Sequence, residues 1–344
     1  MDIAPLDWLL EEDAQLPSAR YFALRDLLDT PEDDPDLQAA RAAVMRTGPV
    51  PVILDAQSAA GYWVKPGGGY SPKYRSTVWS LLVLAELGAD PSNERVRSGC
   101  EYLLGNSLAA NAAFSCYMKS SPSGAVLCLN GNMLYALRAL GFGKDPRLTA
   151  ATDWLARAIV GDGELQYFAS GTSAPGFACG VNQGKPCGWG ANKALRGLLA
   201  IPKSERTATV KRALDVGAGF LLSRNPVEAD YPYTERVSST WFKLGFPLSY
   251  WSDVLETTAN LVDLGKSHDQ RLRPAFEWIL AKADKQGRWR LQNSLNRKMW
   301  IDFEHQGKPS KMVTLRVLRM LKAAGADLKS SPSNWARALP GGPS

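Results

Sequence analysis

Five apolar segments with the spacing of a helix recur along this chain of 344 residues, and each ends at a stop signal. They span residues 78–88, 128–141, 187–202, 251–265 and 314–325. The stop is a glycine, or in one case a proline, and the stops recur about every 50 to 65 residues. A regular interval of this length indicates a repeated supersecondary unit that buries its apolar face against its neighbours.

A second helical segment follows four of these five stops. The second segments span residues 93–104, 147–159, 207–222 and 270–282, and their apolar anchors are Tyr102, Trp154, Phe220 and Trp278. Each unit is therefore a helix pair with a long loop. Helix pairs repeated five or six times bury their apolar faces either in an open solenoid or in a closed double ring.

The loops favour the ring. Three of them carry a glycine shortly before an aromatic residue: Gly61 before Trp63, Gly176 before Phe177, and Gly287 before Trp289. Such loops resemble the glutamine–tryptophan repeats of squalene–hopene cyclases and the related loops of protein prenyltransferase β subunits. Both families fold as an α/α toroid, in which inner helices line a central cavity.

Segments 286–293, 298–302 and 307–319 resemble a bacterial, squalene-cyclase-like branch of the same superfamily. The resemblance covers about residues 50–325 and implies an all-α fold, an α/α toroid of about five to six helix pairs. We expect residues 49–344 to form the toroid and to end in a short disordered tail. Residues 1–48, with a helical stripe at 18–28, are expected to complete or cap the ring.

Composition sets the broad class of the protein. A hydrophobic content of 45% in 344 residues is enough to bury a large core in a globular protein. The chain begins without the pattern of a signal peptide and has no apolar run of about 20 residues, so we predict a cytoplasmic protein without a transmembrane segment. Its net charge of +6 is spread along the chain, and we predict no nucleic-acid partner.

Four cysteines stand at matching places in two successive units. Cys128 and Cys187 begin helical segments, and Cys116 and Cys179 lie in the Gly-rich loops ahead of them. Cytoplasmic thiols stay reduced and a helix N-terminus stabilises a thiolate, so the set predicts a zinc site. With all four ligands that site is structural, whereas a cysteine that leaves opens a position for water or substrate. The alternatives are buried free thiols, disulfides or an iron–sulfur cluster.

Whether the chain is an enzyme is left open by two missing motifs. We find no Asp-x-Asp-Asp acid motif of the cyclases on an inner segment, and Lys185 stands where prenyltransferases place the zinc-binding aspartate before Cys187. No histidine completes that zinc triad near residues 250–253. Asp253 and Glu256 lie three apart on one helix face and are candidates for a catalytic acid and base. The alternative is that these two carboxylates pair with nearby Lys or Arg side chains or cap the helix.

Basic and aromatic side chains stand at or near the beginnings of the inner segments. Lys73 and Tyr74 precede the first of them and are candidates to hold an anionic head group such as a diphosphate, unless they are simply exposed. The resemblance to cyclases implies that aromatic residues in such places line the cavity and stabilise carbocations, while the alternative is that they fill the inner layer. These residues are Trp79, Tyr135, Trp189, Tyr250 and Trp251.

We therefore expect a toroid that binds an apolar, isoprenoid-like small molecule in a central cavity next to a Cys-rich zinc site. Acid–base or cyclisation chemistry would then take place on that ligand. Two other functions stay open at this point. One is a non-catalytic, zinc-stabilised toroid that binds a lipid or a protein partner, and the other is a zinc-dependent hydrolase on the same ring.

Overall fold

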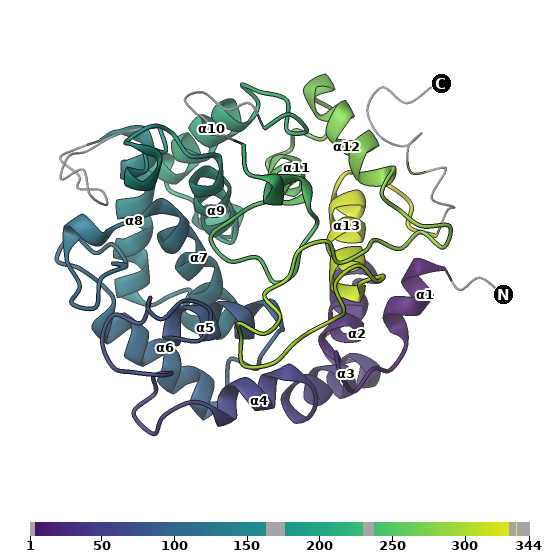
Figure 1. Ribbon diagram of the computed structural model, residues 1–344, viewed down its shortest axis with the longest axis horizontal. Helices are drawn as coiled ribbons and strands as arrows, with labels where there is room; N and C mark the ends of the chain where they lie inside the picture. The colour runs from purple at the N-terminus through teal and green to yellow at the C-terminus, as the bar shows by residue number, and fades with distance from the viewer. Residues whose placement is uncertain (1–3, 163–175, 230–236, 330–334, 336–344) are drawn as a thin grey trace.

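The computed structural model describes residues 4–162, 176–229, 237–329 and 335. Within these ranges the chain is helical, and its β-contacts are isolated bridges. Figure 1 shows the helices in two concentric rows around a common centre. The predicted all-α toroid is therefore confirmed.

The inner row surrounds the centre of the molecule. Two of its members, α2 and α7, are continued by the π-helical turns η1 and η3. The inner row consists of α2 (Ser18–Phe22) with η1 (Ala23–Leu27), α5 (Thr77–Glu86), α7 (Leu127–Leu137) with η3 (Arg138–Phe142), α9 (Gly188–Leu199), α11 (Val254–Asp263) and α13 (Lys311–Ala323).

The outer row packs against the inner one, and short helical turns lie in the connections. The outer row consists of α3 (Pro35–Arg46), α4 (Pro49–Asp55), α6 (Glu94–Asn106), α8 (Pro146–Val160), α10 (Ala208–Leu221) and α12 (Arg273–Leu280). The remaining elements are α1 (Pro5–Leu10), η2 (Pro122–Gly124), η4 (Gly180–Asn182), η5 (Lys203–Glu205), η6 (Ser239–Phe242) and η7 (Gln270–Leu272).

The ring is closed by contacts between its first and last helices. Successive inner helices from α5 to α13 pack on one another, and α13 packs on α2 and η1. The hydroxyl of Ser18 in α2 donates a hydrogen bond of 2.7 Å to the carbonyl oxygen of Leu87, at the end of α5. Every inner helix therefore has an inner neighbour on each side, as a closed ring requires.

Inner helices are apolar around most of their circumference because they are covered on several sides. Every residue of α5 is buried. The helices α7 and α9 approach each other most closely at Gly131 and Gly197, where a β-carbon on either glycine would clash with the backbone of the facing helix. Glycine at these two positions therefore sets the spacing of α7 and α9.

The loops with a glycine and an aromatic residue connect each unit to the next inner helix. Trp63 and Trp289 are fully buried, and the indole Nε1 of each donates a hydrogen bond of 2.7 Å to the carbonyl oxygen of an isoleucine ten residues earlier in the chain. Their backbone N–H groups donate to Thr77 Oγ1 of α5 and Thr314 Oγ1 of α13, at 3.2 and 3.0 Å. Two units at opposite ends of the sequence thus use the same anchor.

A long connection between α12 and α13 crosses one opening of the ring (Figure 1). The indole Nε1 of Trp300 donates to the carbonyl oxygen of Arg75 and to Ser80 Oγ, both at 3.1 Å. Arg75 Nε in turn donates to the carbonyl oxygen of Met299 at 3.0 Å. The last repeat is therefore fastened to the beginning of α5, across the centre of the molecule.

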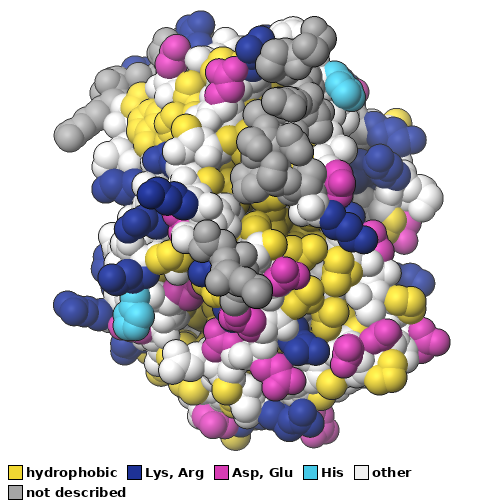
Figure 2. Space-filling model, turned by 90° about the vertical axis from the view of Figure 1, so that its right-hand side faces the viewer, with side chains coloured by type: hydrophobic (Ala, Val, Ile, Leu, Met, Phe, Trp, Pro, Cys, Tyr) yellow, Lys and Arg dark blue, Asp and Glu magenta, His cyan; other side chains and the backbone are white. Residues whose placement is uncertain are grey.

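Two features of the surface and the termini complete the fold. Acidic and basic side chains are interspersed on the face that includes α1 and α12 (Figure 2). Among the described helices, none has the length and apolar content that crossing a membrane requires. The disordered tail that the sequence predicts beyond residue 335 lies outside the described residues, and the domain bounds stay a prediction.

Candidate functional site

Two cavities open onto the inner row of helices, and they share no lining residue. The first, about 550 Å³ in volume, lies at the beginnings of α7 and α9, and we call it the thiol pocket. The second, about 330 Å³ in volume, lies toward the ends of α5, α9 and α11, and we call it the polar cavity. The thiol pocket is defined by Tyr70, Lys73, Cys116, Cys128, Phe177, Cys179, Cys187, Trp189, Trp241 and Tyr250.

The loop that precedes α9 brings two thiols together. Its two arms pair like a short hairpin, because Cys187 N donates to the carbonyl oxygen of Phe177 at 2.9 Å and Cys179 N donates to that of Lys185 at 3.1 Å. The side chains of Cys179 and Cys187 are hydrogen-bonded to each other. Cys187 is also the N-cap residue of α9, and its sulfur accepts from Gly190 N at 3.5 Å.

Burial keeps the thiols of this pocket protonated. Desolvation raises the pKa of Cys128 to about 12 and that of Cys116 to about 11. The hydrogen bond with Cys179, together with desolvation, raises the pKa of Cys187 well above its ordinary value. At neutral pH these groups are therefore thiols rather than thiolates.

The predicted zinc ligands all line one pocket, but they do not converge on one point. In the described ranges, no three His, Cys, Asp or Glu side chains lie close enough together to hold a metal ion. As they lie, the residues therefore do not fit a four-cysteine zinc site, which needs four thiolates at one centre. Zinc binding stays a prediction. The fifth cysteine, Cys100 of α6, is buried in the core.

Five of the predicted substrate-binding aromatic residues form one connected cluster. Tyr250 lies at its centre, with its ring centroid 6.2 Å from that of Trp79, 6.1 Å from that of Trp189 and 5.6 Å from that of Trp251. Tyr74 joins the cluster through Trp79, at 5.7 Å. Trp189 and Tyr250 face the thiol pocket, while Tyr74, Trp79 and Trp251 are not among the residues that line it.

Lys73 stands at the opening of the thiol pocket, where its side chain is exposed. Its Nζ lies 4.3 Å from the ring centroid of Tyr250 and 6.0 Å from that of Tyr70. In the described part of the chain, no carboxylate forms an ion pair with Lys73. The structure thus brings a cation, an aromatic wall and four thiols to a single pocket.

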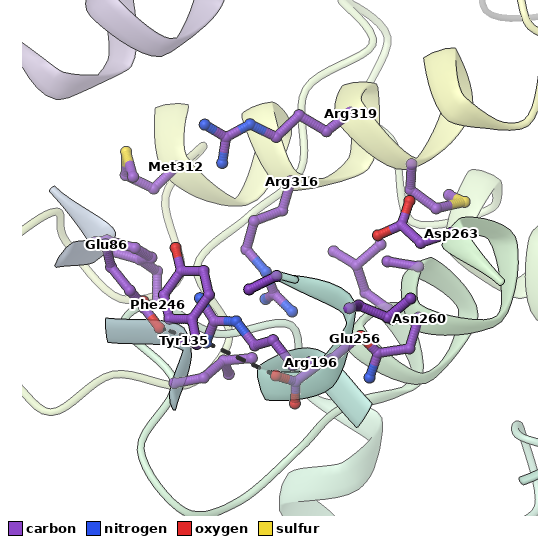
Figure 3. Close-up of a pocket in the computed structure, with 16 residues that line it drawn as sticks. Glu86, Tyr135, Arg196, Phe246, Glu256, Asn260, Asp263, Met312, Arg316 and Arg319 are labelled. Atoms are coloured by element: carbon purple, nitrogen blue, oxygen red, sulfur yellow. Dashed lines mark hydrogen bonds and ion pairs between the residues drawn. The ribbon is translucent and has the colours of Figure 1, made fainter. Parts of the chain in front are cut away.

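The polar cavity is lined by two further predicted residues, Tyr135 and Glu256. Figure 3 shows Glu86, Tyr135, Arg196 and Glu256 around it, with Arg316 and Arg319 extending from α13. The guanidinium of Arg196 lies 3.6 Å from the ring centroid of Tyr135 and donates to Glu86 Oε1 at 2.7 Å. Tyr135 is therefore separate from the aromatic cluster of the thiol pocket.

Both predicted catalytic carboxylates are bound to cations. Lys193 is fully buried, and its Nζ lies 2.8 Å from each carboxylate oxygen of Glu256. Asp253 is also fully buried, and its two oxygens accept from Arg316 at 2.9 Å each. Asp253 Oδ1 accepts from Glu256 N at 2.7 Å as well, which caps α11. Their catalytic role stays a prediction, and both alternatives weighed for them are present.

Sequence reasoning missed several residues that line these cavities or, like Lys193, bind a lining residue. Lys193, Arg196 and Arg316 could have been found, because charges inside otherwise apolar helical segments indicate buried ion pairs. Tyr70 and Trp241 of the thiol pocket come from connecting segments, where no periodicity marks them. Asp263 precedes a glycine stop, and no sequence signal distinguishes it from other exposed residues at helix ends.

Comparison with known proteins adds little to this geometry. No family model matches the chain, and no curated protein matches it. A structure of the type II terpene cyclase MstE from Scytonema is similar at 13% identity and a TM-score of 0.42, covering 90% of this chain and 87% of that one. A protein from Actinoplanes is similar at 14% identity and a TM-score of 0.32, covering 83% and 100%. Similarity at this level carries no information about the activity of this chain.

Proposed function

We propose that the thiol pocket binds an apolar, isoprenoid-like small molecule with an anionic or hydroxyl head group. The observation that carries this proposal is the set of aromatic side chains that line the pocket beside its thiol and aliphatic residues: Tyr70, Phe177, Trp189, Trp241 and Tyr250. The volume of about 550 Å³ lies in the range of about 300–1,000 Å³ that is typical of small-molecule sites. A branched, unsaturated hydrocarbon chain gains both apolar burial and contact with π faces in such a pocket.

Lys73 orients the ligand in this proposal. Its ammonium group lies at the pocket opening without a carboxylate partner in the described part of the chain, so a diphosphate or carboxylate head group would pair with it there. The hydrocarbon chain of the ligand would then extend into the pocket, past Tyr250 and Trp189 toward the cysteines. We propose binding rather than cyclisation, because the two candidate catalytic carboxylates, Asp253 and Glu256, are already in ion pairs with Arg316 and Lys193.

The test is a binding titration with farnesol and farnesyl diphosphate, followed by intrinsic tryptophan fluorescence and by calorimetry. Gly190 lines the pocket, and a β-carbon there makes only ordinary contacts, so Gly190→Leu fills the pocket without a backbone clash. Gly219→Leu on the exposed face of α10 is the matched control, since nothing lies within 4 Å of a β-carbon there.

We expect saturable binding of both ligands to the wild type and a loss of at least about tenfold in affinity with Gly190→Leu, but not with Gly219→Leu. Lys73→Gln should lower the affinity for farnesyl diphosphate and leave the affinity for farnesol unchanged. Absent binding to the wild type, or equal binding to the two glycine variants, would show that the thiol pocket is not the site. Analysis of the recovered ligand then tells binding from turnover.

Zinc in the thiol pocket is a separate proposal. Zinc would have to draw the thiols to one centre and displace their protons, which the present arrangement does not do. Elemental analysis of protein purified without a histidine tag tests it, in the wild type and in the Cys128→Ser, Cys187→Ser double variant. Stoichiometric zinc that is lost in the double variant supports the site, and a wild type without zinc excludes it.

A further inference from the structure

The polar cavity is a second candidate site, separate from the thiol pocket and independent of its proposed function. Its lining combines side chains from α5, α7, α9, α11 and α13 with Phe246 and Leu248 of the segment before α11. Asp263 is the last residue of α11, and Figure 3 shows its carboxylate pointing from α11 into the cavity. This carboxylate differs from the other two that line the cavity, Glu86 and Glu256, because it has no ion-pair partner among the described residues.

Two other carboxylates that line the cavity, and two that bind its lining arginines, have cationic partners. Arg196 binds Glu86, Lys193 binds Glu256, Arg316 binds Asp253, and Arg319 binds Asp26. Asp263 is different: among the described residues it has neither a hydrogen bond nor an ion pair. Arg206 and Lys203, in the connection between α9 and α10, act on it only at longer range.

The position of Asp263 is unfavourable for a negative charge in two ways. The carboxylate lies at the C-terminal end of α11, where the helix dipole disfavours an anion. Its side chain is exposed to solvent, while the protein around the cavity partly desolvates the carboxylate and raises its pKa. An unpaired charge that destabilises the fold where it stands is characteristic of a binding or catalytic group.

The chemistry of the other lining groups indicates which ligand fits. The guanidinium of Arg316 is already engaged by both oxygens of Asp253, and that of Arg196 by Glu86. An anion would therefore have to compete with carboxylates that are in place, whereas a cation meets an unpaired one. Small and apolar side chains that line the cavity together with Asp263 leave space for the short hydrocarbon part of a ligand: Leu199, Ala200, Ala259 and Met320.

We propose that the polar cavity binds a small organic ammonium ion, with its N–H groups donating to the carboxylate of Asp263 and its hydrocarbon part against α9, α11 and α13. The ligand would give Asp263 the direct ion-pair partner that it lacks among the described residues. Binding depends on pH, because only the ionised carboxylate attracts the cation. The charged groups that face this part of the cavity are Arg316 and Arg319 of α13, Arg196 of α9, Glu256 of α11, Glu86 of α5, and Arg206 and Lys203 of the α9–α10 connection.

The experiment is calorimetric titration of the full chain with n-hexylammonium, n-hexanol and n-hexanoate, which share one hydrocarbon part and differ in charge. Asp263→Asn removes the charge at constant shape. Asp55→Asn is the matched control, because Asp55 is also an exposed last residue of a helix but is paired with Arg95. Gly190→Leu reports any binding of the same probe in the thiol pocket.

We expect n-hexylammonium to bind at least about tenfold more tightly than n-hexanol or n-hexanoate, and more tightly as the pH rises through the pKa of Asp263. Asp263→Asn should remove this preference, while Asp55→Asn and Gly190→Leu retain it. The proposal is overturned if the wild type does not bind n-hexylammonium, if Asp263→Asn binds it equally well, or if Gly190→Leu abolishes binding. A melting temperature of Asp263→Asn at or above that of the wild type shows that the variant is folded.

Discussion

Arg316 of α13 donates two hydrogen bonds of 2.9 Å to the two carboxylate oxygens of Asp253, one from each terminal nitrogen. Asp253 is fully buried and also accepts the backbone N–H of Glu256, so a single carboxylate caps α11 and connects it to α13. This pair lies between the last two inner helices of the ring. Asp253, a candidate catalytic acid from the sequence, therefore has a structural role, and this role predicts how its replacement changes the stability of the protein.

Replacement of Asp253 is expected to destabilise the protein. Asp253→Asn leaves the buried guanidinium of Arg316 without a counter-ion, which costs about 3–5 kcal/mol in comparable buried pairs. Urea unfolding measures the change. The surface N-cap Asp269, which pairs with Arg271, is the matched control, and Asp269→Asn should cost less than about 1 kcal/mol. An Asp253→Asn variant of wild-type stability that lacks activity would instead support the catalytic role.

Replacement of Glu256 should make stability depend on pH. Burial lowers the pKa of Lys193, and Glu256 opposes that effect by favouring the charged form. In Glu256→Gln the folded protein therefore holds the Lys193 proton less tightly than the unfolded chain does, so its stability should rise as pH rises from neutral toward the ordinary lysine value of 10.5. Urea unfolding at several pH values checks this. Glu277→Gln, in an exposed pair with Arg273, should keep only the smaller rise that the lowered pKa of Lys193 gives the wild type.

Asp263→Asn is expected to stabilise the protein above acidic pH. Because desolvation raises the pKa of Asp263 above 3.8, the folded state binds more protons than the unfolded state in the window between the two values. The wild type thus loses stability as pH rises through that window, and the variant does not. Thermal melting at pH 3 and pH 7 should give no difference at pH 3 and a more stable variant at pH 7. If the variant is less stable than the wild type at pH 7, the carboxylate of Asp263 has a stabilising partner, and the claim that it is unpaired is wrong.

The thiols of the pocket should react slowly at neutral pH. Since the pKa of Cys116 is raised to about 11 and that of Cys128 to about 12, only a small fraction of either is thiolate at pH 7. Alkylation by iodoacetamide should therefore accelerate about tenfold per pH unit between pH 7 and pH 10, as followed by peptide mass spectrometry. Farnesol should slow the labelling of both. A rate that is independent of pH in this range would indicate thiolates, and with them an activating cation or a metal.

The sequence by itself determines the architecture. Its apolar segments recur at a regular interval and alternate with amphipathic ones, and a chain of such helix pairs has few ways to bury every apolar face. The Gly-plus-aromatic loops belong to the same local pattern, and Trp63 and Trp289 indeed make equivalent hydrogen bonds to their isoleucine carbonyls. The sharing of one pocket by the four cysteines is likewise foreseeable, because matching places in adjacent repeats lie side by side.

Only the tertiary structure decides which charges are neutralised. Glu256 and Lys193 are 63 residues apart in sequence, as are Asp253 and Arg316, and this separation of about one repeat does not say which charged side chains of neighbouring inner helices meet. The same holds for Asp263, whose cavity is lined from four other inner helices and whose lining arginines are engaged by other carboxylates. Ion pairing depends on distances of a few ångströms between side chains of different repeats. A repeat pattern specifies the backbone that carries those side chains, and the packing of the closed ring determines which of them remain free to bind a ligand.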